Sequence, residues 1–359
     1  MEVKLRKLNK VFRRMDTELP IVENKDALDS TPTLNPQFTV TIRGWEDDKE
    51  EEARDFGQRL CQLTREISNF IDLSRLDRIV IGSDYHEALA SVNGEQAPAP
   101  TPTANEYGNG AAMATNIFRG DEVWSVVVIW TPLVRAIFDH EDPNQPLALH
   151  TFVHELIHVD DTRLFTTTYP GGWRAAKPRD ARDAALQTIV HPYQAEYSAQ
   201  RRSAFAAPVQ GLTHMSMLKE VMSDVDEQVR KERLAYRLQG DVASLWKVVS
   251  ERLGFLFQSL GYALGHADWV LENRDDHPEL ASKFDAEIEA LREMSKGWLI
   301  DASREAVQPL FNLTEWTNMD VYDPLIAVAE RLLNEYRMFT SVREDDLYID
   351  MPYTGIHDL

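Results

Sequence analysis

The chain has 359 residues, of which 43% are hydrophobic and 27% charged, a balance typical of folded globular proteins and too apolar for a disordered one. It carries 38 basic and 59 acidic residues, which gives a formal net charge of −21. This negative charge repels phosphate backbones and anionic lipid surfaces, so the composition argues against nucleic acid and membranes as partners.

Cys61 is the single cysteine, so no intramolecular disulfide can form, which suits a reducing compartment. The amino terminus is basic but lacks the apolar core and small-residue cleavage site of a secretion signal, and no stretch is apolar enough to span a membrane. We therefore expect a cytoplasmic protein. Secretion without a leader and injection into another cell are alternatives that the sequence leaves open.

The first elements predict a β-α-β unit. Residues 1–36 combine a basic start with the proline-containing stretch DSTPTLNPQ, which is typical of an arm and a linker. After them, alternating residues over 38–45 predict a strand, apolar residues at helical spacing over 56–70 predict a helix, and the apolar run 77–82 predicts a buried strand. Two strands joined by one helix are expected to lie parallel.

The next elements lead to a helix rich in histidine. Residues 83–94 predict a short helix ended by glycine, and the proline-rich residues 95–110 predict a long surface loop. Two extended runs around Arg-Gly-Asp-Glu within 111–130 predict an antiparallel hairpin, with its second strand at 123–130. Apolar residues at helical spacing over 149–157 then predict an amphipathic helix.

The carboxyl-terminal half has a different pattern of apolar residues. From about residue 208 the sequence shows long helical patterns and few strand signals, which predicts a mainly α-helical second domain. Small residues in LGYALGHADW, residues 260–269, indicate closely packed helices. The helical patterns cover residues 214–239, 241–273, 278–300 and 322–340.

The histidine-rich helix carries the sequence HTFVHELIHVDD, in which His154, Glu155 and His158 form an HExxH motif. Residues four apart on a helix lie one turn apart on the same face, so the two imidazoles can bind one metal ion. The glutamate between them is placed to act as general base on a water activated by the metal. Random placement yields this motif on the order of 0.02 times in such a chain, which favours a metal site over a structural histidine helix.

A catalytic zinc usually takes three protein ligands, so a third is expected outside the motif. We favour Glu196, because it lies among alanines in HPYQAEYSAQRRSAF, where Pro192 is placed to begin a second helix. His191 is a rival ligand, or a group that hydrogen-bonds the transition state. A solvent-facing Glu196 is the plain alternative.

Three further polar residues lie close to the motif. Asp160 and Asp161 follow His158 too closely to reach the ion easily, which favours roles beside the site or at the surface. His150 lies one turn before His154, but three consecutive turns of a helix hardly share one ion, because residues eight apart are separated by about 12 Å of helical rise. We expect His150 to support the pocket or to be a hydrogen-bonded core residue.

In these residues the chain resembles the zincin metallopeptidases, specifically the gluzincins, in which two HExxH histidines and a glutamate on a downstream helix bind zinc. The resemblance covers residues 37–207. It implies Zn²⁺ held by His154, His158 and Glu196, with Glu155 as the catalytic residue. It also implies a small sheet whose edge strand pairs with an extended peptide, and residues 123–130 occupy that place in the order.

The fold expected from the sequence and the resemblance is therefore α+β. A zincin-like domain over 37–207, with a small mixed sheet and the HExxH helix, follows the arm of residues 1–36 and precedes a mainly α-helical domain over 208–359. The expected function is that of a zinc-dependent metallopeptidase of narrow specificity, acting on a peptide or protein, with a protein partner recruited through the helical domain. The alternatives are a catalytically silent zincin-fold scaffold protein and a zinc amidohydrolase acting on a non-peptide amide.

Overall fold

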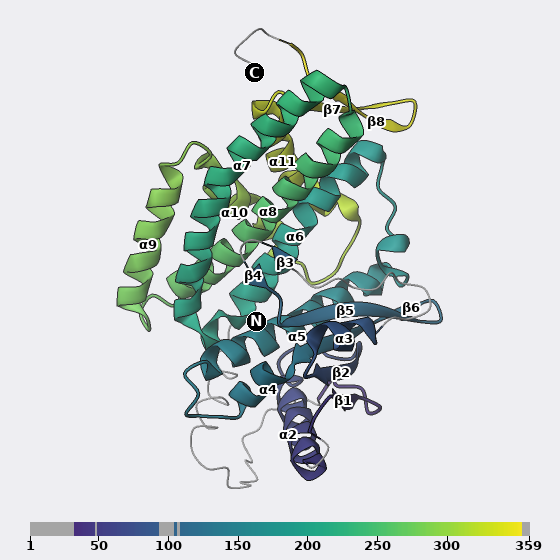
Figure 1. Ribbon diagram of the computed structural model, residues 1–359, viewed down its shortest axis with the longest axis vertical. Coiled ribbons are helices and arrows are strands. Elements are labelled where there is room, and N and C mark those ends of the chain that lie inside the picture. The colour runs from purple at the N-terminus through teal and green to yellow at the C-terminus, as the bar shows by residue number, and fades with distance from the viewer. Residues whose placement is uncertain (1–31, 47–48, 93–103, 106–107, 354–359) are drawn as a thin grey trace. The chain divides into compact units, whose positions relative to one another are not determined.

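The computed structural model has the α+β class that the sequence predicts, with small sheets and many helices (Figure 1). The expected arm over 1–36 and the expected loop over 95–110 lie largely outside the described residues. None of the helices in the described part of the chain combines the length and the apolar character that a membrane span requires. The structure describes residues 32–46, 49–92, 104–105 and 108–353.

The chain forms two compact units. The first comprises Met1–Ala175 together with Phe205–Ala207, and the second comprises Ala176–Ala204 together with Pro208–Leu359. The sequence led us to expect the first domain to end at residue 207. The difference arises because helix α6, Ala181–Ser203, packs along α8, Val242–Glu272, and so belongs to the helical unit.

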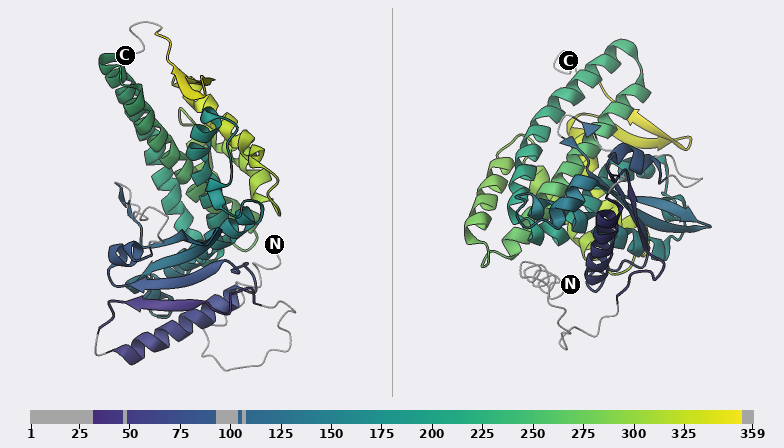
Figure 2. Two further views of the ribbon diagram at one scale, coloured as in Figure 1. Left: turned by 90° about the vertical axis from the view of Figure 1, so that its right-hand side faces the viewer. Right: turned by 60° about the horizontal axis from the view of Figure 1, so that its bottom comes forward.

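A mixed sheet forms the centre of the first unit, and its strands can be followed in Figure 2. Strands β1, Thr39–Arg43, and β2, Leu76–Gly82, are parallel and joined by helix α2, Glu50–Ile67, as the β-α-β pattern predicts. Strand β6, Glu122–Trp130, pairs parallel with β2 and antiparallel with β5, Ala112–Arg119. The predicted hairpin over 111–130 is thus confirmed.

The strand order places β5, and not β6, at an edge. The four strands of this sheet, among the described residues, lie in the order β1-β2-β6-β5. The expectation that residues 123–130 form the edge strand is therefore wrong, because β6 pairs on both sides. Its run of valines already fits an interior strand, since Val126, Val127 and Val128 are fully buried.

Helices cover the sheet and build its core. Helix α3, Tyr85–Ala90, packs on β2 and β6 over a cluster that includes Val80 and Val126. Helix α4, Thr131–Ile137, follows β6 directly, and α5, Gln145–Thr168, packs against β5 and β6. The histidine-rich sequence is thus helical, as predicted. Between β2 and β5, the short strands Ala104–Asn105 (β3) and Gly108–Asn109 (β4) pair antiparallel.

The second unit is mainly helical, as the sequence predicts, although three expected boundaries differ. Helix α6 begins at Ala181, with the Asp180 side chain accepting a hydrogen bond from the Asp183 N–H at its start, and Pro192 lies inside it. The pattern over 278–300 divides into α9, Pro278–Arg292, and the start of α10, Trp298–Phe311. A turn ending at Gly297 separates the two helices. In this turn the Gly297 N–H donates a hydrogen bond to the Met294 carbonyl.

The remaining elements complete this unit. Helix α7, Gly211–Gln239, lies along α8, in agreement with the two patterns that predict them (Figure 1). The pattern over 322–340 ends earlier than expected, as α11, Asp323–Glu335. An antiparallel hairpin follows, formed by β7, Phe339–Arg343, and β8, Asp346–Asp350, which the sequence did not predict.

Two glycines of α8 set its close packing on α6. A Cβ added at Gly265 would lie 2.5 Å from the carbonyl oxygen of Tyr197, and one added at Gly261 would lie 2.7 Å from that of Tyr193. Both obstacles are backbone atoms, so they cannot move aside as a flexible side chain can. This contact explains the small residues in LGYALGHADW and confirms that they serve close helix packing.

We predict that Gly265→Ala destabilises the helical unit by about 1–3 kcal/mol, because the added methyl group forces α6 and α8 apart. The melting temperature followed by circular dichroism should fall. Gly254→Ala is the matched control on the same helix, since a Cβ there meets nothing within 4 Å. That control should raise stability by up to about 1 kcal/mol through helix propensity. Equal effects of the two substitutions would contradict the packing argument.

Candidate metal centre

Helix α5 presents the two histidines of the motif side by side. His154 and His158 lie one turn apart, and their Nε2 atoms are 3.1 Å apart, with the donor of this hydrogen bond set by the tautomers. His154 is 6% exposed and His158 is half-buried. Two nitrogens on one tetrahedral zinc are separated by about 3.3 Å, so this spacing is close to what a shared ion requires.

Glu155 lies between the histidines and contacts the edge of the sheet. Its Oε2 accepts a hydrogen bond of 2.6 Å from the backbone N–H of Ala114 in β5. The side chain is 8% exposed, and a carboxylate so deeply buried needs such a partner. Burial of the Tyr85 phenol raises its pKa, and the negative charge of Glu155 adds a smaller increase. The general-base candidate is thus held at a defined point of the edge strand.

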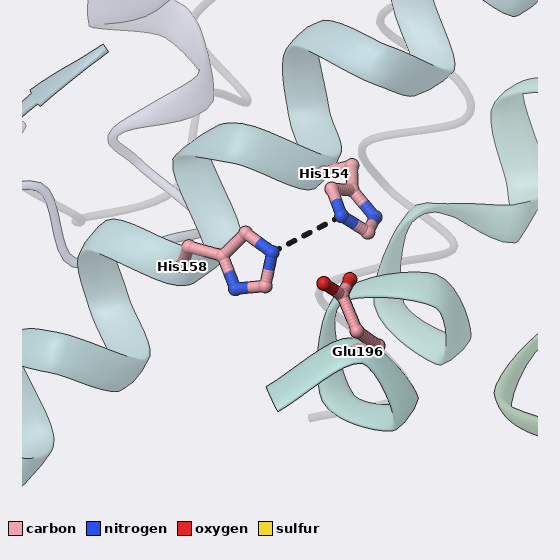
Figure 3. A group of neighbouring side chains, drawn as sticks. All are labelled: His154, His158 and Glu196. Carbon is pink, nitrogen blue, oxygen red and sulfur yellow. Dashed lines mark hydrogen bonds between the residues drawn. The ribbon is translucent and has the colours of Figure 1, made fainter. Parts of the chain in front are cut away.

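Glu196 of α6 is the third member of the group. Among the described residues, His154, His158 and Glu196 form a group that could hold a metal ion, and each offers one ligand atom. Figure 3 draws the three side chains, with His154 and His158 on α5 and Glu196 on α6. Glu196 is only 9% exposed, so the alternative that its side chain faces solvent does not hold. Two imidazoles and one carboxylate form a donor set that catalytic zinc uses in proteins, so these residues fit the metal that the sequence suggests.

Gln258 of α8 holds the Glu196 carboxylate and was not found from the sequence. Its Nε2 donates to Oε1 of Glu196 at 3.0 Å and to the hydroxyl of Tyr262 at 3.2 Å. The close approach at Gly261 brings α8 against Glu196, because a Cβ there would lie 2.9 Å from the Glu196 Cβ. The only sequence signal was the small-residue stretch beginning at residue 260, which indicates the contact but not its partner.

The other polar candidates have different partners. Nδ1 of His191 lies 3.0 Å from the hydroxyl of the buried Tyr322, which itself donates to Gln194. Asp160 accepts from Arg163. His191, Asp160, Asp161 and His150 are not members of the three-residue group, and the ring of His150, which is 3% exposed, lies 6.0 Å from that of His154.

Comparison of the chain with models of protein families, with curated proteins and with solved structures gave no match. The function is therefore inferred from the residues of this chain.

We predict that Gln258→Ala weakens zinc binding by about 10- to 100-fold, because the second oxygen of a ligating carboxylate loses its hydrogen bond. Titration against a chelating dye measures the affinity. Gln62→Ala is the control, since Gln62 donates only to Glu66 on the exposed face of α2. An unchanged affinity in Gln258→Ala would show that the contact does not support the ligand.

Proposed function

We propose that this protein is a zinc-dependent metallopeptidase of the zincin kind. One observation carries the proposal: His154 and His158 present neighbouring Nε2 atoms on α5, while Glu155 between them contacts the backbone of an edge strand. A helix whose histidines only stabilise the fold requires neither the neighbouring Nε2 atoms nor the contact of Glu155 with the strand. The Glu196 carboxylate, as a third donor beside two imidazoles, supports the choice of zinc.

The residues divide the chemistry among them. Zinc held by His154, His158 and Glu196 would supply a Lewis acid that polarises a carbonyl and lowers the pKa of water. Glu155 takes the proton from the attacking water and returns it to the leaving amine. One of its carboxylate oxygens accepts from Ala114, which fixes the side chain in place while the other oxygen handles the proton.

The edge strand supports a peptide as substrate. In an antiparallel ladder, alternate residues direct their N–H and C=O groups outwards. The Ala114 N–H reaches Glu155 and not β6, so Ala112 and Asn116, two residues away on each side, share its outward orientation. An extended peptide can pair with these groups and so lie beside Glu155. A small non-peptide amide would make no use of such an edge.

We predict one tightly bound zinc ion per chain in protein purified without chelators, and its loss in His154→Ala, because two ligands seldom retain the ion. Elemental analysis gives the stoichiometry. His86→Ala is the control, since His86 is an exposed histidine of α3. Protein free of zinc, or equal zinc in both variants, would contradict the metal centre.

We predict that Glu155→Gln keeps the zinc but lowers peptide hydrolysis by about 10²- to 10⁴-fold, because the amide cannot accept the proton. Cleavage sites mapped in a proteome-derived peptide mixture, with wild type against the variant, provide the measurement. Cleavage by the variant at the wild-type rate would overturn the assigned role. A zinc-loaded wild type that cleaves no peptide would favour the scaffold or the non-peptide amidohydrolase.

A further inference from the structure

The face of α5 that carries the histidines continues to an aromatic residue. Phe165 lies seven residues beyond His158, which is almost two full turns, so it shares the face of His154 and His158. Its ring stacks on that of Trp173 at a centroid distance of 4.9 Å and an interplanar angle of 27°. Phe165 is buried, whereas Trp173 is 40% exposed. The indole is thus partly covered by the Phe165 ring and keeps a solvent-accessible surface.

The segment that carries Trp173 is held against the sheet. Trp173 lies in a short 3-10 helix, Gly172–Arg174, that follows α5. Val123 at the start of β6 donates its N–H to the Pro170 carbonyl, and Gly172 has a positive φ of 63°. A Cβ at Gly172 would lie 3.0 Å from the Val123 side chain. Trp173 is thus fixed in position relative to the β5–β6 hairpin.

The same short helix contacts the edge strand. The Arg174 guanidinium lies 4.3 Å from the centroid of the Phe118 ring. Phe118 is four residues beyond Ala114 on β5, so both belong to the set of residues whose backbone groups point outwards. The aromatic residues therefore lie at one end of the outward-facing stretch of β5, and Glu155 contacts its other end.

The distance of the aromatic residues from Glu155 can be estimated in two ways, along α5 and along β5. Ten residues of α5 separate Glu155 from Phe165, about 15 Å of helical rise. Four residues of β5 separate Ala114 from Phe118, about 13 Å of strand. An extended peptide spans the same distance in about four residues. A strand added antiparallel, the slightly more stable arrangement, places its amino-terminal part beside Phe118.

We propose that Trp173, backed by Phe165, is a specificity-determining residue that binds an aromatic side chain of the substrate, three or four residues to the amino-terminal side of the cleaved bond. This inference rests on the proposed peptidase function and names the class of peptide that the enzyme selects. The exposed indole surface offers stacking to an aromatic ring. Smaller or charged side chains gain less from this surface.

The test uses matched peptides that differ only by Phe or Ala at that position, chosen from sites that the wild type cleaves. The wild type is expected to favour Phe by about tenfold in kcat/KM. Trp173→Ala should lower this ratio to near one, and Trp173→Phe should restore part of it. Zinc content and circular dichroism establish that each variant is folded and loaded.

Trp130→Ala is the matched control, because Trp130 is 42% exposed and lies at the opposite end of β6. It should keep the preference for Phe at the same position. Cleavage without an aromatic preference there, or a preference that survives Trp173→Ala, would overturn the subsite and leave the peptidase intact. A wild type that cleaves no peptide overturns the proposed function, and the subsite with it.

Discussion

The hydrogen bond from the Ala114 N–H to the Glu155 carboxylate is the contact on which the arrangement of the first unit's site depends. A carboxylate that is 8% exposed is costly to bury without a donor, and an outward N–H of an edge strand supplies one. The same bond joins α5 to β5, against which the helix also packs. It thereby aligns the histidine face of the helix with the strand on which an extended chain can pair.

Much of this could be predicted from the sequence because the signals are local. The HExxH spacing fixes the relative positions of His154 and His158 wherever the helix forms, since helical geometry alone determines it. The β-α-β unit and the β5–β6 hairpin follow from alternation and from turn residues that lie within them. The apolar neighbours of Glu196 indicate a helix side that faces inwards, and its side chain is indeed buried.

The rest depends on contacts between distant segments. Whether β5 or β6 forms the edge is decided by which of them pairs with β2, and residues 123–130 contain no information about that partner. Gln258 supports Glu196 from 62 residues away, so no local pattern connects them. The last helix boundary was missed for a different reason, because β7 and β8 are short, mostly polar strands that lack a strong apolar alternation.

The glycines of α8 have an evolutionary consequence. Where interlocking side chains set the distance between two helices, substitution of any one of these side chains changes that distance. At Gly261 and Gly265 the spacing is instead set by the main chain of α6, which every sequence possesses. The approach of α8 to the part of α6 that carries Glu196 therefore depends on the two glycines keeping no side chain.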